Sequence, residues 1–220
     1  MSLSAPLGLL AFWGGMAAAA HAYPLRYDWR YEAISALLFP DYDPGGYLWA
    51  CAGVAVCGVA GIAWTAQAND RLGDTPSASQ IGLRILRLGF LCMCFAVLPD
   101  RLLPLPKGHE LFAILAFLGI GFGVMQQMFT VPPGRESKDQ QSPLAQLGGF
   151  IGAGRLLVPL ALAGLTLAYV ALIRRNLPWI DQAWLAGGIP AYLNVGAWEW
   201  ITCALFSMCV LVLWHRRAEG

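Results

Sequence analysis

The chain has 220 residues, of which 58% are hydrophobic and only 12% are charged, and its mean hydropathy is +0.57. Soluble globular domains carry about 25% charged residues, so this composition excludes an ordinary soluble domain and indicates an integral membrane protein. The 14 basic and 13 acidic residues leave a net charge of +1. Such a balance leaves no excess of positive charge to attract nucleic acid, so we exclude nucleic acid as a partner.

A bilayer core about 30 Å thick needs about 20 apolar residues per helix. Six such stretches follow one another along the chain, at residues 3–22, 46–68, 81–99, 110–131, 147–173 and 195–214. The segments between them contain the turn-forming residues Gly, Pro, Asp and Asn, as at 41–46 and 132–134. The sequence therefore predicts an all-α, polytopic bundle of six transmembrane helices in a single domain, residues 1–220.

The first span ends in Ala20-His21-Ala22, which imitates a signal-peptidase site but follows no basic n-region, so we expect an uncleaved first helix. Basic residues divide almost evenly between the two membrane faces and give little guidance on orientation. We place both termini in the cytoplasm, because the basic sequence His215-Arg216-Arg217 and the hydrophilic 134–142 loop then share one face. The Arg174-Arg175 pair would fall on the other face. The expected location is the bacterial inner (cytoplasmic) membrane.

Small residues indicate where helices approach one another. Gly119 and Gly123 form one G-x-x-x-G motif, and Gly148 and Gly152 form another. Such motifs let helix backbones pack closely, within one chain or between copies in a homo-oligomer. The cysteines all lie in apolar runs without metal-binding spacing, so we interpret them as small core hydrophobes. They are Cys51, Cys57, Cys92, Cys94, Cys203 and Cys209.

A polar and aromatic stretch, residues 21–40, follows the first span. On the predicted topology it shares the outer face with polar residues of later loops. The candidate ligand-binding residues of this outer polar cap are Asp28, Arg30, Ser35, Asp100 and Arg101. The cap could bind a lipid headgroup or a substrate, or its charges could simply face water, as those of interfacial loops do.

Glu199 lies in Trp198-Glu199-Trp200 at the start of the last span, where an unpaired carboxylate is costly. We expect it to have a partner, and His109 or Arg101 could supply a shared proton or a charge. A carboxylate and a histidine can perform acid-base chemistry, so His109 and Glu199 are candidate catalytic residues. A structural ion pair would explain the same residues.

Three arginines are predicted near the opposite face. Arg84 and Arg87 are spaced i, i+3 on one side of the third span, and Arg155 lies two turns into the fifth. Because each guanidinium is a planar fork of donors, the three are suited to lipid phosphate. Ordinary snorkelling to bulk headgroups is the alternative.

The common catalytic motifs are missing, including G-x-S-x-G, H-E-x-x-H and the phosphate-binding glycine loops. The only lysines, Lys107 and Lys138, lie in predicted loops, which argues against retinal bound through a Schiff base. A zinc site of His21 and His109 with Asp28 or Asp100 is conceivable. We nevertheless expect neither a metal nor a cofactor.

Several short sequence features follow one another along the chain in a particular order. They are Ile34-Ser35-Ala36-Leu37, the lead-in Pro44-Gly45-Gly46, a span ending at Pro99, another opening at His109, and Trp198-Glu199. This layout resembles the six-helix bacterial and archaeal membrane family, a domain of unknown function, that is related to the eukaryotic FGF-receptor-activating/DRAM/Sfk group. The resemblance implies lipid handling at the membrane and no established reaction. Ala36 departs from the Asp that the family often has after the serine.

Three functional hypotheses follow. In the first, the protein binds or handles a lipid or other amphiphile through the outer polar cap, with membrane lipids as its partners. In the second, it is a membrane-embedded hydrolase or transferase for lipid headgroups, with His109 or Glu199 as the general base. In the third, which rests on Glu199 and a kink at Pro159, it is a small transporter or channel.

Overall fold

The computed structural model describes residues 3–24, 26–30, 32–72, 77–98, 108–130, 153–168 and 195–219. The described elements are helices α1 (Ser4–Ala22), η1 (Ile34–Leu38), α2 (Tyr47–Asp70), α3 (Ala78–Ala96), α4 (Gly108–Thr130), the helix Ala153–Ala168 and α7 (Val195–Glu219). No strand occurs among these residues, so the prediction of an all-helical protein is confirmed.

Five of these helices, α1, α2, α3, α4 and α7, are long and apolar enough to cross a membrane, which indicates an integral membrane protein. Their bounds agree with the predicted spans to within a few residues. The predicted fifth span, 147–173, extends beyond the described residues, and its described part, Ala153–Ala168, is shorter than the other five helices. The count of six spans, the membrane side of each terminus and the kind of membrane stay predictions.

Helix α3 begins three residues before the predicted position 81, at Ala78, because Ser77 caps it. The Ser77 hydroxyl accepts a hydrogen bond from the Gln80 N–H, and the Gln80 side chain accepts one from the Ser77 N–H, each at 3.2 Å. This capping box satisfies two backbone donors at the helix start. Its S-x-x-Q pattern is readable in the sequence.

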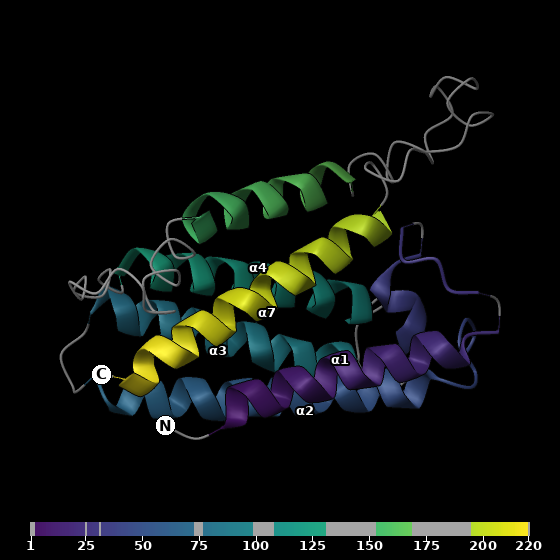
Figure 1. Cartoon of the computed structure of the whole chain (residues 1–220), viewed down its shortest axis with the longest axis horizontal. Helices are drawn as coiled ribbons and strands as arrows, with labels where there is room; N and C mark the ends of the chain where they lie inside the picture. Colours follow the sequence, from purple (N-terminus) through teal and green to yellow (C-terminus); the bar gives the residue numbers. More distant parts are fainter. Residues whose placement is uncertain are drawn as a thin grey trace, which may run out of the picture.

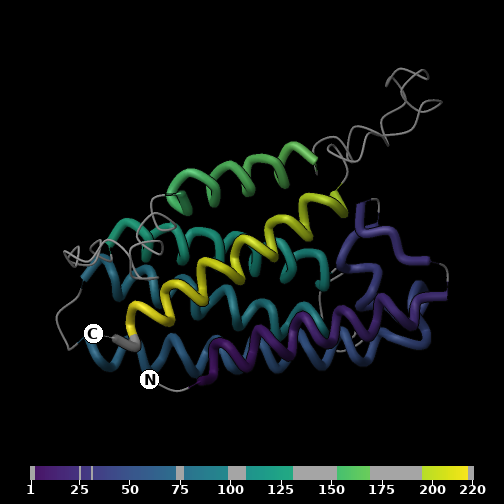
Figure 2. The backbone as a smooth tube through the Cα atoms, in the orientation of Figure 1, coloured from purple at the N-terminus to yellow at the C-terminus, as the bar shows by residue number. Residues whose placement is uncertain are grey.

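Figure 1 shows α1, α2, α3 and α4 as neighbours that alternate in direction, with α7 crossing in front between α1 and α4. The closest helix pairs are α1 with α2 and α3 with α4, whereas α7 touches α1, α4 and η1 over smaller areas. The tube in Figure 2 shows that α1 starts and α7 finishes at the same end of the bundle. We call this the terminal end, and the opposite end, where η1 lies, the η1 end.

The G-x-x-x-G motif of α4 packs against helix α3 of the same chain. A Cβ atom on Gly119 would lie 2.7 Å from the Gly89 Cα of α3, and one on Gly123 would lie 2.7 Å from the Leu86 Cα. Only glycine permits this approach of the α3 and α4 backbones. A homo-oligomer through these residues stays a prediction, and Gly148 and Gly152 lie outside the described residues.

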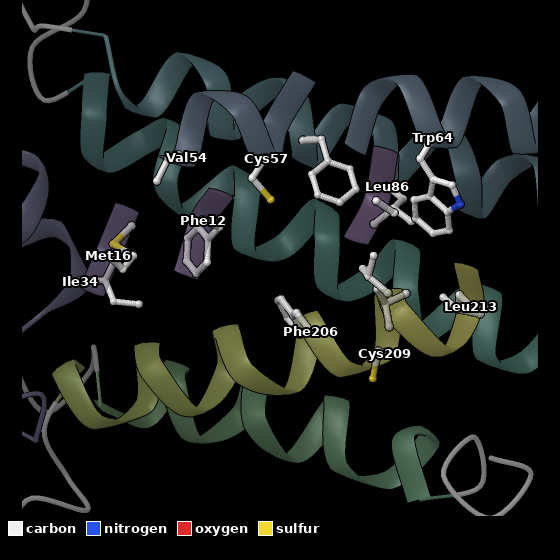
Figure 3. Packing of buried hydrophobic residues seen from close by; sticks show 14 of the residues in the cluster. Phe12, Met16, Ile34, Val54, Cys57, Trp64, Leu86, Phe206, Cys209 and Leu213 are labelled. Atoms are coloured by element: carbon white, nitrogen blue, oxygen red, sulfur yellow. The ribbon is translucent and has the colours of Figure 1, made fainter. Parts of the chain in front are cut away.

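The hydrophobic core runs along the bundle axis. Figure 3 shows Phe12, Val54, Leu86 and Phe206 converging from α1, α2, α3 and α7. All six cysteines are free, and three of them, Cys57, Cys92 and Cys209, are buried. The interpretation of these three as core hydrophobes is confirmed, and the other three are partly buried.

Candidate functional site

Segment η1 is held in place by Glu199 of α7. The Glu199 side chain is only 4% exposed, and its Oε2 atom accepts a hydrogen bond of 2.8 Å from the Ile34 N–H. The first N–H groups of a helix have no partner within that helix, so the carboxylate caps η1. This hydrogen bond goes to a backbone group, a partner that the sequence did not reveal.

The start of α7 lies directly against the segment that leads into η1. A Cβ atom on Gly196 would lie 2.5 Å from the Glu32 carbonyl oxygen and 2.7 Å from the Glu32 carbonyl carbon. No larger residue fits there without moving backbone. Gly196 thus allows Glu199, one turn further on, to reach Ile34.

His109 fixes the other side of η1. The residue is 5% exposed, and its Nδ1 atom hydrogen-bonds the Ala96 carbonyl oxygen at the end of α3. Its ring packs edge-on against Phe39, just after η1, with ring centroids 4.4 Å apart. Because a carbonyl only accepts, Nδ1 carries a proton, and the buried Nε2 atom has no hydrogen-bond partner among the described residues.

Tyr27 ties the loop before η1 to α7. Its hydroxyl donates to the Glu32 carbonyl oxygen at 3.0 Å and accepts from the Trp200 Nε1–H at 2.9 Å. Burial raises the pKa of Tyr27 well above its usual value of 10, and the nearby Glu199 carboxylate raises it further. The phenol therefore stays protonated and able to donate. Glu199 and Trp200, adjacent in α7, both fix this loop.

Asp28 and Arg30, two of the predicted cap residues, bind each other at the surface. Arg30 donates to Asp28 from Nη2 at 2.7 Å and from Nε at 2.9 Å, and the Arg30 side chain is 55% exposed. The side-chain hydrogen bond from Arg30 lowers the pKa of Asp28 from 3.8 to about 2. The pair remains charged at all physiological pH values.

A carboxyl titration checks this pair. Because the folded-state pKa of Asp28 lies below the ordinary 3.8, the pair stabilises the fold above about pH 4, and this stabilisation is lost as the pH falls through 2. Carbon-13 NMR of the Asp28 carboxyl should show a midpoint near 2. The Arg30→Gln variant should return the midpoint toward 3.8. An unchanged midpoint in that variant would refute the role of Arg30.

An apolar cavity of about 110 Å³ lies beneath η1 in the centre of the bundle. Ile34 and Leu38 of η1 form its roof, and α1, α2, α3, α4 and α7 all contribute to its walls. Among the described residues that line it, which include Phe12, Phe90 and Phe206, Ser207 alone carries a hydroxyl. That hydroxyl already donates to the Cys203 carbonyl oxygen at 2.8 Å.

A groove of about 600 Å³ lies beside this cavity, between α1 and α7. Trp13, Tyr27, Trp29 and Trp200 line it, and no charged side chain of the described residues does. Met16 lines both the groove and the cavity, so the two adjoin there.

Trp13 lines the groove and hydrogen-bonds a residue of the cavity wall. Its Nε1–H donates to the Ser207 hydroxyl at 3.1 Å, and its ring packs against Trp200 with centroids 5.7 Å apart. Trp13 lies in the middle of α1. An indole N–H in the middle of a span needs an acceptor, but the sequence does not indicate which residue of which span supplies it.

The three arginines of the predicted lipid-phosphate site have separate surroundings. Arg84 is exposed on α3, whereas Arg87 donates to the Thr65 carbonyl oxygen of α2 at 3.0 Å. Arg155 donates to the Met128 carbonyl oxygen of α4 at 2.9 Å and lies over the Phe129 ring. The structure therefore gives these side chains no common partner among the described residues, and their binding of lipid phosphate stays a prediction.

The remaining predicted residues give less information. Ser35 is half-buried within η1, while Asp100 and Arg101 lie outside the described residues. His21 is exposed at the last turn of α1. Across the described ranges, no three His, Cys, Asp or Glu side chains come together in a way that could hold a metal ion.

Comparisons of the chain with protein-family models, with curated proteins and with solved structures find no match. The resemblance to the six-helix membrane family therefore stays a prediction.

Proposed function

We propose that the protein binds a lipid or other amphiphile, with an apolar chain of the ligand in the central cavity and its polar end near the aromatic groove. The observation that carries this proposal is the apolar cavity beneath η1. Apolar cavities of about 150 Å³ in protein cores stay dry and bind small hydrocarbons. A cavity of about 110 Å³ accordingly suits a segment of an alkyl or prenyl chain rather than a whole lipid.

The groove supports the same assignment. It adjoins the cavity at Met16 and is lined by indole and phenol rings, which prefer the region where hydrocarbon meets headgroups. The exposed Asp28–Arg30 pair belongs to the loop that carries Tyr27. With both termini in the cytoplasm, as we propose, the groove and the loop lie at the outer interface.

In this proposal the two predicted catalytic residues have a positioning role. Glu199 caps η1, and His109 packs against Phe39 just beyond it. Together they hold the roof of the cavity in place. Neither residue lines the cavity or the groove.

A cavity-filling variant tests the proposal. Ala116 is 7% exposed and lines the cavity, so Ala116→Leu should fill the space that a ligand chain needs. Native mass spectrometry of gently released protein, combined with lipid analysis, should show one retained amphiphile class in the natural chain and its loss in Ala116→Leu.

Ala52→Leu is the matched control, because Ala52 is exposed on α2 and lines neither the cavity nor the groove. This variant should retain the ligand. Retention of the same amphiphile by Ala116→Leu at the natural level would overturn the proposal.

A further inference from the structure

The terminal half of the bundle is rich in arginine. The arginines there are Arg71, Arg84, Arg87, Arg155, Arg216 and Arg217. None of the six is ion-paired within the part of the chain that the structure describes. The hydrogen-bond partners given for Arg71, Arg87, Arg155 and Arg217 are neutral carbonyl, hydroxyl and amide oxygens. The arginines also outnumber the described acidic residues of this end, Asp70 and Glu219.

Arg217 is held by a network that joins three helices. Its Nη2 atom donates to the Ser79 hydroxyl of α3 at 2.8 Å and to the Gln127 Oε1 atom of α4. The Gln127 Nε2 atom in turn donates to the Ser79 carbonyl oxygen at 2.6 Å, and Gln127 is fully buried. The guanidinium is therefore fixed in position before any ligand binds.

Arg71 lies next to this network. Its Nη1 atom reaches the Arg217 carbonyl oxygen at 3.5 Å, which brings the ends of α2 and α7 together. Arg71 is exposed, so its side chain is accessible to a ligand.

At this end, buried hydrogen-bond donors without a described partner outnumber buried acceptors without one. The Nε atoms of Arg87, Arg216 and Arg217 and the Nε1 atom of Trp64 are buried and have no partner among the described residues, against one such acceptor, the Asn69 Oδ1 atom. The C-terminal ends of α2 and α7 favour positive charge here. The helix dipole does not, however, provide hydrogen-bond acceptors for the buried N–H groups. Proteins normally give such groups a hydrogen-bond partner.

We infer that Arg71 and Arg217 bind a phosphate group at the terminal end. Guanidinium forks match phosphate oxygens in geometry and charge, and the Ser79–Gln127 pair keeps one fork fixed. The phosphate could come from the headgroup of an anionic lipid or from a soluble phosphate. This site lies at the opposite end from η1, so it goes beyond the proposed function and stands or falls separately.

The test measures binding to the full purified chain in detergent with three probes: dioctanoyl phosphatidic acid, dioctanoylglycerol and inorganic phosphate. The phosphatidic acid should raise the midpoint of thermal unfolding by more than dioctanoylglycerol does, because dioctanoylglycerol lacks the phosphate and can bind only through its acyl chains. Arg217→Gln and Arg71→Gln should each weaken binding by about tenfold. Affinity should also fall as the salt concentration rises.

Arg26→Gln is the control, since it removes the same charge from an exposed position in the loop before η1, at the opposite end of the bundle. It should change the affinity by less than about twofold. Arg71→Gln keeps the test decisive if Arg217→Gln unfolds, because Arg71 is exposed and lies outside the Ser79–Gln127 network.

Each outcome has a defined meaning. Binding of phosphatidic acid but not inorganic phosphate supports a lipid headgroup, and equal binding of both supports a soluble phosphate. No binding of either probe would overturn the inference. So would stabilisation by dioctanoylglycerol equal to that by phosphatidic acid, or equal losses in Arg71→Gln and Arg26→Gln.

Discussion

Replacing Glu199 with alanine should lower the free energy of unfolding by about 1–3 kcal/mol, because the Ile34 N–H then loses its acceptor in a buried position. The change also removes the hydrogen bond that joins α7 to η1. Thermal or denaturant unfolding in micelles measures the loss, and hydrogen exchange at the Ile34 amide locates it. The exchange of that amide should become faster than in the natural chain.

Glu199→Gln separates capping from charge. The glutamine keeps a carbonyl oxygen that can accept from Ile34, so it should recover most of the stability that alanine loses. Asp41→Ala removes an exposed carboxylate from the loop after η1 and should be neutral. Slow Ile34 exchange in Glu199→Ala would contradict the capping role.

Gly15→Ala is the second change from which we expect a large effect, about 1–3 kcal/mol of lost stability. A Cβ atom on Gly15 of α1 would collide with the Trp49 carbonyl oxygen and lie 3.0 Å from the Gly53 Cα atom of α2. Both are backbone atoms, which side-chain rotation does not move. The α1 and α2 helices would therefore have to separate.

Gly14 is an unusually close control, because it is the adjacent residue of the same helix and a Cβ atom there would meet nothing within 4 Å. Gly14→Ala adds the same methyl group and improves helix propensity. Unfolding measurements should thus give opposite signs for the two alanine variants. Equal effects would show that helix propensity, rather than packing against α2, determines the outcome.

The helices themselves were predictable from the sequence. Hydropathy and length give five of the spans to within a few residues, since those criteria depend on consecutive residues alone. The face that each helix turns toward its neighbours was not predictable in the same way. Helices that are apolar on all sides lack the one-sided periodicity that identifies a buried face in soluble proteins.

The candidate site was predictable only as a set of residues. A carboxylate without a partner is costly in hydrocarbon, and this cost correctly indicated that Glu199 needs a partner. One such partner, the Ile34 N–H, lies 165 residues away in the sequence. Trp13 and Ser207 are separated by 194 residues. Such pairs depend on how α7 packs on α1 and η1, and a single sequence contains no signal for that arrangement. Arg217 was overlooked for the same reason, because its fixed position depends on Ser79 and Gln127 from two other helices.

The position of α7 has a consequence for biogenesis. Helices α1 to α4 precede it in synthesis, and N-terminal parts of a chain generally fold first. Until α7 inserts, Phe12 and Met16 face an open trough, and Tyr27 and Ile34 have no Trp200 or Glu199 to hold them. The cavity is therefore completed last, so an amphiphile can occupy it from the side of the bilayer during assembly.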